Sequence, residues 1–226
     1  MKLACFNNSS DPNNTIDFGV GRTPVSRHIQ LLFGIRLELF MTYPHWEYFL
    51  ALEDDLIQCA RFVEFSPTNY AVYSLEFARV LLASASEFDV VAKMLCNESD
   101  ATTKVKNIDD YRQVILHGYP KFPTVEILIP RYGLSFKPWE DWQTQTNPNW
   151  WKAYNKVKHE RDKYFSNATL ENSLKSVAGL MCALMYYYQK TLGIEPSIDP
   201  APRLLAPQWY GNYFPAEISW TFTLPK

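Results

Sequence analysis

The stretch from Pro148 to Phe165, PNWWKAYNKVKHERDKYF, brings aromatic, amide and cationic side chains together with one histidine. Read at 3.6 residues per turn, it predicts a single helix with Asn149 as its N-cap. One side of this helix is largely aromatic and the opposite side is charged, a pattern typical of a helix that packs in a bundle. The aromatic side holds Trp150, Tyr154, Val157, Arg161, Tyr164 and Phe165. The charged side holds Lys152, Lys156, Glu160 and Lys163.

Two cations interrupt the aromatic side of this helix. Arg161 lies near its middle, and Lys158 lies close by. A buried cation without a partner is costly, so we expect an acid from another helix to meet Arg161 or Lys158. Asp89 is the first candidate and Glu87 the second. The alternative for Asp89 is a local ion pair with Lys93, one helical turn further along.

Helical segments surround this stretch on both sides. A helix is expected over Pro44–Phe65, and Ser66-Pro67 gives a start signal for a second helix that runs to about Cys96. The second helix is apolar nearly all round, which predicts a central, buried position. A short helix capped by Asn107 and a long one that Gly193 ends, over about 168–192, complete the set.

Acidic residues Glu53, Asp54 and Asp55 lie in the first of these helices. Three adjacent carboxylates could be metal ligands, but acids on the solvent face of a helix are far more common. We therefore expect this triplet to be solvated. No metal and no cofactor are expected, since the four cysteines are widely spaced and form no zinc motif.

Extended segments are shorter and fewer. Alternating apolar and polar residues predict strands at 28–40, 124–129 and 219–224, with an irregular connection over 132–146. The fold expected is therefore mainly α: a four- to five-helix bundle with a small β-sheet from N-terminal, middle and C-terminal strands. We expect a single domain over residues 1–226, with a helical core at about 44–192 and the segments 28–40 and 194–226 packed on it.

Composition sets bounds on the partners. The chain has 226 residues, of which 47% are hydrophobic and 15% aromatic, which is ample for a packed core. Its net charge of −2 supplies no general attraction to nucleic acid or to an anionic membrane, so any RNA contact requires a local patch. The N-terminus lacks the apolar segment of a signal peptide, and the longest apolar run is short for a bilayer. We expect a cytoplasmic protein with no membrane partner.

The hexapeptide from Tyr154 to His159, YNKVKH, is the motif that carries a resemblance. It resembles the motif of the HEPN superfamily, in which an arginine is followed by a polar residue, often asparagine, and then by a histidine. Here Asn155 and His159 match, and Tyr154 stands where the arginine belongs. Taken with SEFD at 86–89, Lys93, Pro138-Trp139 and WWKAYNKVKHER, residues 44–190 resemble a group of uncharacterised bacterial proteins related to HEPN domains.

The resemblance implies a metal-independent ribonuclease of a bacterial defence or toxin type, acting on RNA as a homodimer. His159 would be its acid/base, a task that suits imidazole, and Asn155 would orient it. Lys158 or Arg161 would replace the charge of the absent arginine, because a tyrosine at position 154 donates a hydrogen bond but carries no positive charge. A lysine supplies only a point charge, whereas an arginine grips two phosphate oxygens.

A second hypothesis belongs to a different class. The chain would be a non-catalytic HEPN-like module that binds a partner protein or a nucleotide, with the cations and acids named above as structural contacts. This hypothesis predicts that Arg161→Met or Asp89→Asn lowers the melting temperature markedly. Under either hypothesis, we expect Trp150, Trp151 and Tyr154 in the core, with base stacking as the alternative. Lys152, Lys156 and Lys163 either follow a phosphate backbone or form a solvated face.

Overall fold

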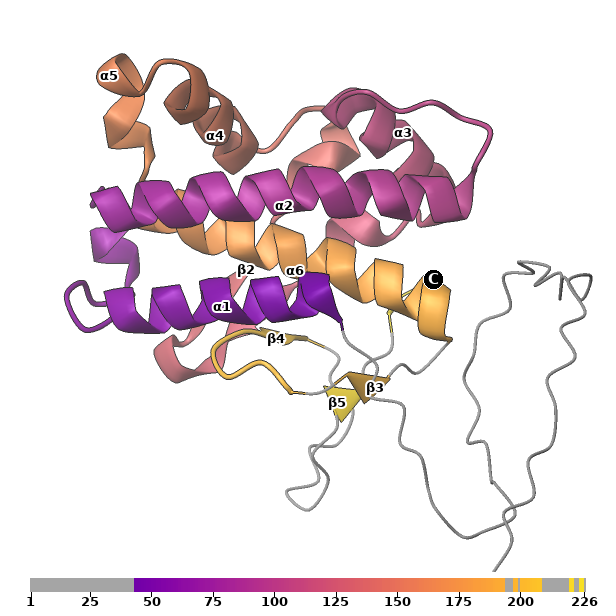
Figure 1. The fold of residues 1–226 in the computed structure, drawn as a ribbon. Helices are drawn as coiled ribbons and strands as arrows, with labels where there is room; N and C mark the ends of the chain where they lie inside the picture. Colours follow the sequence, from indigo (N-terminus) through magenta and orange to yellow (C-terminus); the bar gives the residue numbers. More distant parts are fainter. Residues whose placement is uncertain (1–42, 194–196, 199, 209–219, 222–223, 226) are drawn as a thin grey trace, which may run out of the picture.

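The structure is a computed structural model that describes residues 43–193, 197–198, 200–208, 220–221 and 224–225. Within these residues, helices form a bundle with a small antiparallel sheet below it, which confirms the mainly α fold class (Figure 1). The strand expected at 28–40 lies outside the described residues. The helices are α1 (Pro44–Cys59), α2 (Leu75–Ser99), α3 (Ile108–Gly118), α4 (Asn149–His159), the short α5 (Arg161–Tyr164) and α6 (Leu170–Leu192).

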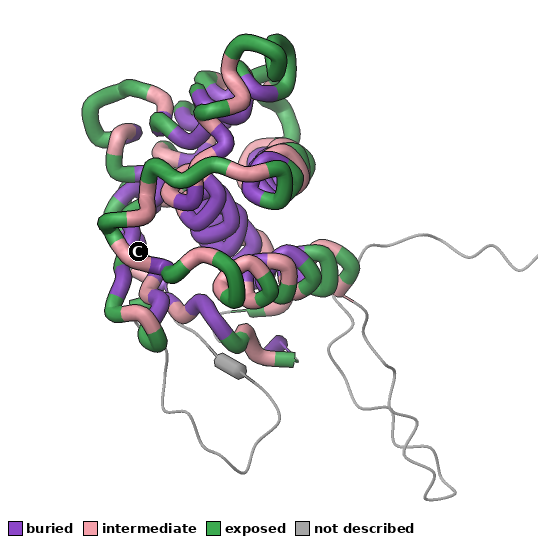
Figure 2. The backbone as a smooth tube through the Cα atoms, turned by 90° about the vertical axis from the view of Figure 1, so that its left-hand side faces the viewer, coloured by how far each residue is buried: buried purple, intermediate pink, exposed green. Residues whose placement is uncertain are grey.

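Helix α6 lies at the centre of the bundle and is buried along most of its length (Figure 2). Helix α2 runs parallel to it, and buried hydroxyls join the two. Ser173 Oγ donates to the carbonyl of Phe77 at 2.9 Å, and the hydroxyls of Ser84 and Ser176 lie 2.7 Å apart. The central, buried position predicted for α2 belongs to α6 instead, because α2 faces solvent on one side, where Val90 is 42% exposed.

Side-chain caps fix where α2 and α6 begin. Ser74 Oγ accepts from the backbone N–H of Phe77, and Thr169 Oγ1 accepts from that of Asn172. The start signal at Ser66-Pro67 opens only a 3₁₀ turn, η1 (Pro67–Asn69), so α2 begins later than predicted. Helix α6 ends at Gly193, whose φ of 125° favours a residue without a side chain, as expected.

Helix α1 runs antiparallel to α2 and α6 and ends at Cys59, six residues before the predicted Phe65. Its Glu53 is only 1% exposed, so the prediction that the acidic triplet is solvated was wrong for this member. The carboxylate accepts three backbone N–H bonds of 2.8 to 2.9 Å, from Arg203, Leu204 and Leu205. Burial raises the pKa of Glu53, against the lowering effect of these bonds. Glu53 thus fastens the segment after α6 to α1.

Short strands cover the side of α6 that faces away from α2. A sheet of order β2-β1-β4 joins β1 (Ile127–Ile129), β2 (Leu134–Phe136) and β4 (Ala206–Pro207), all antiparallel. A separate pair joins β3 (Ser197–Ile198) to β5 (Trp220–Thr221). Only β5 lies within the predicted C-terminal strand at 219–224. Strand β1 begins three residues later than predicted, and Thr124 belongs to the 3₁₀ turn η2 (Phe122–Thr124). The predicted C-terminal strand therefore pairs with β3 and not with the predicted middle strand, whose partners β2 and β4 were not predicted; β2 lies in the connection predicted to be irregular.

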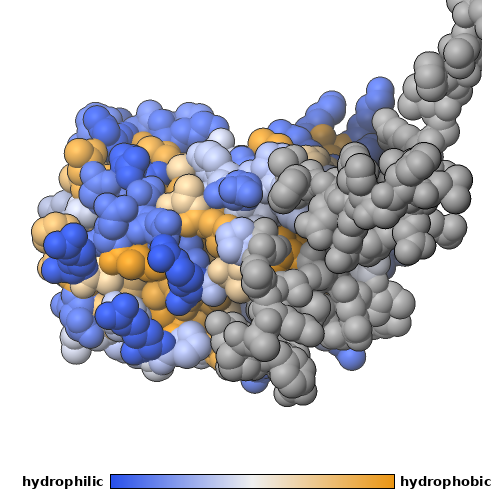
Figure 3. All heavy atoms as spheres, turned by 60° about the horizontal axis from the view of Figure 1, so that its bottom comes forward, coloured by the Kyte–Doolittle hydropathy of each residue, from blue (hydrophilic) through white to orange (hydrophobic). Residues whose placement is uncertain are grey.

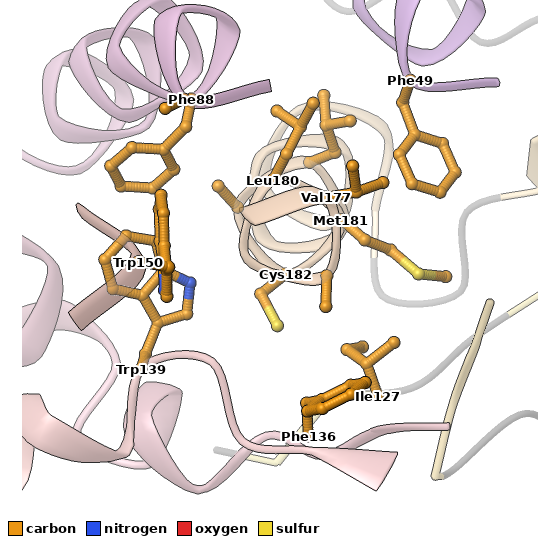
Figure 4. Close-up of a cluster of buried hydrophobic side chains, with 14 of the residues drawn as sticks. Phe49, Phe88, Ile127, Phe136, Trp139, Trp150, Val177, Leu180, Met181 and Cys182 are labelled. Atoms are coloured by element: carbon orange, nitrogen blue, oxygen red, sulfur yellow. The ribbon is translucent and has the colours of Figure 1, made fainter. Parts of the chain in front are cut away.

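A tryptophan cluster fills the angle between α2, α4 and α6 (Figure 4). The rings of Trp139 and Trp150 lie 4.9 Å apart, and that of Phe88 stands against both. Trp139 Nε1 donates to the carbonyl of Gly179 at 3.1 Å, and a Cβ at Gly179 would lie 2.9 Å from the ring of Trp150. The glycine therefore lets both indoles approach the backbone of α6 directly.

The outer surface mixes hydrophilic and hydrophobic residues, as Figure 3 shows for the lower face. The most exposed large apolar side chain among the described residues is Phe62, at 85%, in the turn after α1. Leu75 at 59% and Tyr73 at 52% follow near the start of α2. None of the described helices is long and apolar enough to cross a membrane.

Candidate functional site

Helix α4 packs its tryptophan side into the bundle, as predicted. Trp150 is 1% exposed, and its Nε1 donates to the carbonyl of Pro138 at 2.9 Å. Trp151 and Tyr154 are also buried, so these rings belong to the core and the stacking alternative does not apply to them. The predicted cap was wrong by one residue: Pro148 occupies the N-cap position, and Asn149 is already helical.

The predicted single helix over 148–165 is interrupted at Glu160. This residue has φ −140° and ψ 54°, so α4 ends at His159 and α5 starts at Arg161 in a new direction. The helical wheel that placed Arg161 among the aromatic residues therefore does not continue beyond His159. Arg161 is exposed, and a buried acid is not needed to neutralise it.

The two acids proposed as partners bind elsewhere. Asp89 pairs with Lys93, as in the alternative left open, and also accepts a 2.8 Å hydrogen bond from the hydroxyl of Tyr111 on α3. Burial, and then the bond to Asp89, raise the pKa of Tyr111, so the hydroxyl stays protonated and donates. Glu87 lies 2.5 Å from Nδ1 of His45 on α1. The prediction that Asp89 or Glu87 neutralises the cations of the 148–165 stretch was therefore wrong.

The polar residues of the motif contact their own helix. Asn155 Nδ2 donates to the carbonyl of Trp151 at 2.9 Å, so its amide is bonded one turn back and does not orient His159. Lys158 Nζ donates to the hydroxyl of Tyr154 at 3.1 Å. His159 is exposed at the end of α4, and its imidazole forms no hydrogen bond or ion pair within the described part of the chain.

Basic side chains gather where α4 meets α5, and we call this surface the basic corner: Lys156, Lys158, His159, Arg161 and Lys163. All five side chains are exposed. Lys156 Nζ lies 5.3 Å from the centre of the Tyr164 ring, and Lys163 pairs with Glu160 at 2.6 Å. Lys152 is exposed one turn before Lys156.

An exposed aromatic residue adjoins the basic corner. Phe165 directly follows α5, and the ring of Tyr73 stands edge-on to its ring at a centroid distance of 5.6 Å. Tyr73 is 52% exposed. An isolated backbone bridge between Tyr73 and Thr169 holds this segment against the start of α6. Cations beside a free ring face can bind an anionic, stacked ligand. Of the proposed site residues, Asn155 and Lys158 bond within α4, whereas His159 and Arg161 are exposed on either side of Glu160.

Sequence reasoning missed Glu53 and the pairing of His45 with Glu87. The signal for Glu53 was present, because it lies four residues after Phe49 and three before Leu56 on the buried stripe of α1. Neither the pairing of Glu87 nor the hydrogen bond from Tyr111 to Asp89 has a local sequence signal. Comparison of the chain with protein-family models, with curated proteins and with solved structures finds no match.

Exchanging Arg161 for methionine is expected to change the free energy of unfolding by less than about 0.5 kcal/mol, because the side chain is exposed. The matched control is Arg112→Met on α3. Arg112 is 9% exposed and bonds to Asp109 and Asn147 at 3.0 Å each, so about 1 to 2 kcal/mol should be lost. Thermal unfolding followed by circular dichroism compares the two. Equal losses would restore Arg161 to a structural role.

Proposed function

We propose that this protein is a non-catalytic, HEPN-like module that binds single-stranded RNA through the basic corner. The observation that carries the proposal is the exposure of the cations at 156–163, which no acid of α2 neutralises. Between residues 152 and 163 there are five lysines and arginines against two acids, a local charge of +3 in a chain of −2. Phosphate contacts supply most of the sequence-independent affinity for nucleic acid.

The exposed ring of Tyr73 favours RNA over a ligand that is held by charge alone. A ring that is 52% exposed beside a cationic surface offers one face to an unstacked base. Stacking of this kind contributes about 1 to 3 kcal/mol per base and tolerates any sequence. The expected ligand is therefore a flexible single strand whose backbone follows α5 while a base contacts Tyr73.

The non-catalytic half of the proposal depends on geometry within α4. A general base needs a fixed orientation within hydrogen-bond reach of the proton it abstracts. The amide of Asn155 is used by the carbonyl of Trp151, and the ammonium of Lys158 by the hydroxyl of Tyr154. Arg161 lies on a different helix from His159, so the charge expected beside the imidazole has no fixed place.

Reversing two charges of the basic corner should weaken RNA binding about tenfold or more, through lost attraction and added repulsion. The variant is Arg161→Glu with Lys163→Glu, measured by fluorescence anisotropy on a labelled strand of about 20 nucleotides. For two lost phosphate contacts, the slope of log affinity against log salt should fall in magnitude by about 1.4.

The matched control for that variant is Lys104→Glu with Lys106→Glu. Both lysines are exposed in the loop between α2 and α3, at the other end of α2 from α5, and the control has the same net charge (Figure 1). It should bind RNA nearly as well as the unaltered protein. If both double variants weaken binding equally, the attraction is not specific to the basic corner.

A further inference from the structure

A pocket of about 350 Å³ lies at the opposite end of the bundle from α5, between the start of α1 and the end of α6. Its volume lies in the range of small-molecule sites. Aromatic and apolar side chains form most of its wall, including Tyr43, His45, Tyr187, Tyr188 and Met94. None of these residues belongs to the basic corner, so the pocket is a separate site.

Three tyrosine rings of the pocket stand at steep angles to one another. The rings of Tyr43 and Tyr188 lie 5.3 Å apart at 85°, and those of Tyr187 and Tyr188 lie 5.2 Å apart at 61°. The ring of His45 is perpendicular to that of Tyr187 at 6.5 Å. Rings in such an arrangement can turn more than one π face toward the same bound group, as in the aromatic cages that hold ammonium ions.

The charges around the pocket favour a cation. Glu87 contacts Nδ1 of His45 at 2.5 Å. The charge of Glu87 helps to raise the pKa of Tyr188, and that of Glu98 helps to raise the pKa of Tyr187. Burial is the larger cause for both tyrosines, which are therefore neutral near pH 7. None of the described residues that line the pocket is a lysine or an arginine.

Helix termini contribute partial charges of both signs. The carbonyl end of α6 reaches the pocket at its last residue, Leu192, and favours a cation. The start of α1 at Pro44 lies on the other wall and has the opposite effect. The two helix ends offset each other, and Lys190 lies in the last turn of α6, so attraction for a cation depends on Glu87, which also contacts His45, and on the exposed Glu98.

We propose that this pocket binds an alkylated ammonium group, such as a trimethylammonium, through cation–π contacts with Tyr43, Tyr187 and Tyr188. An alkylated ammonium suits the site better than a primary amine, because it needs no hydrogen-bond acceptor and fills an aromatic wall with methyl groups. Glu87 and Glu98 supply long-range attraction. The binding does not depend on RNA or on the basic corner.

The test is calorimetric titration of the full chain with choline and with its neutral analogue, in which carbon replaces the quaternary nitrogen. Choline should bind with a Kd of about millimolar or tighter, and the analogue at least about tenfold more weakly, because only the cation interacts with the π faces. Tyr187→Ala should weaken choline binding about tenfold, whereas Tyr187→Phe should stay within about threefold of the unaltered protein.

Two controls keep the result interpretable. Circular dichroism establishes that each variant is folded, and Tyr48→Ala, at a tyrosine of α1 that is 44% exposed and does not line the pocket, should leave binding unchanged. Glu87→Gln should weaken choline binding without affecting the neutral analogue. Equal affinity for choline and the analogue, unchanged binding by folded Tyr187→Ala, or no saturable binding of choline would each overturn the proposal.

Discussion

Replacing Trp150 with alanine is expected to lower the free energy of unfolding by about 3 to 5 kcal/mol, the largest loss of any substitution considered. Trp150 is 1% exposed and contacts the rings of Phe88, Trp139 and Trp151. Removing the indole leaves a cavity between α4 and α6, because the neighbouring indole of Trp139 is fixed by its bond to Gly179. It also leaves the carbonyl of Pro138 without its 2.9 Å donor.

The measurement is chemical denaturation followed by far-ultraviolet circular dichroism. Phe62→Ala is the control, since this ring is 85% exposed and its removal should change stability by less than about 0.5 kcal/mol. Because a domain of this kind is stable by only about 5 to 15 kcal/mol, Trp150→Ala should be close to unfolding at moderate temperature. A loss below about 1 kcal/mol would mean that α4 is not packed in the core as described.

Glu53→Ala is expected to cost about 2 to 4 kcal/mol, because it leaves two buried backbone N–H groups and a part-buried one without an acceptor. The effect should be local as well as global. Amide hydrogen exchange at Arg203, Leu204 and Leu205 should accelerate more than exchange within α6, since the carboxylate is what fastens this segment to α1.

The control for Glu53 is Asp55→Ala on the same helix. Asp55 pairs with Arg79 at 3.1 Å on the surface, and an exposed ion pair of this type contributes at most about 1 kcal/mol. Exchange at residues 203–205 should then stay as slow as in the unaltered chain. If these amides exchange as slowly in Glu53→Ala as in the unaltered protein, residues 203–205 are held by their apolar contacts instead.

Local signals predicted the helices well and their ends less well. Asn107 caps α3 as expected, accepting from the N–H groups of Asp109 and Asp110, and Gly193 ends α6. Periodicity identified α1 and α2 for the same reason, since burial of one face is written into the spacing of apolar residues. The start signal at Ser66-Pro67 was genuine but opened only a 3₁₀ turn.

The interruption at Glu160 could not be predicted from local signals. Glutamate is a good helix former, and neither proline nor glycine occurs between Asn149 and Phe165. Directly after α5, the ring of Phe165 contacts that of the distant Tyr73, and tertiary packing of this kind can override helix propensity. A helical wheel extended across Glu160 wrongly placed Arg161 in the core. That placement led to the expectation that Asp89 would neutralise it.

The candidate site shows the same division between local and long-range contacts. The pair of Asp89 with Lys93 follows from a spacing of four residues, whereas the bond from Tyr111 depends on how α3 packs on α2. Spacing alone also placed Asn155 and His159 one turn apart. It could not reveal that the amide of Asn155 is bonded to the backbone of its own helix.

Binding without cleavage is tested by following a labelled RNA strand for both binding and length in the same incubation. The protein should bind the RNA and release it at full length, and His159→Ala should bind equally well or slightly more weakly. Cleavage by the unaltered protein that disappears in His159→Ala would contradict the account, because it would make the exposed imidazole at the end of α4 a catalytic group.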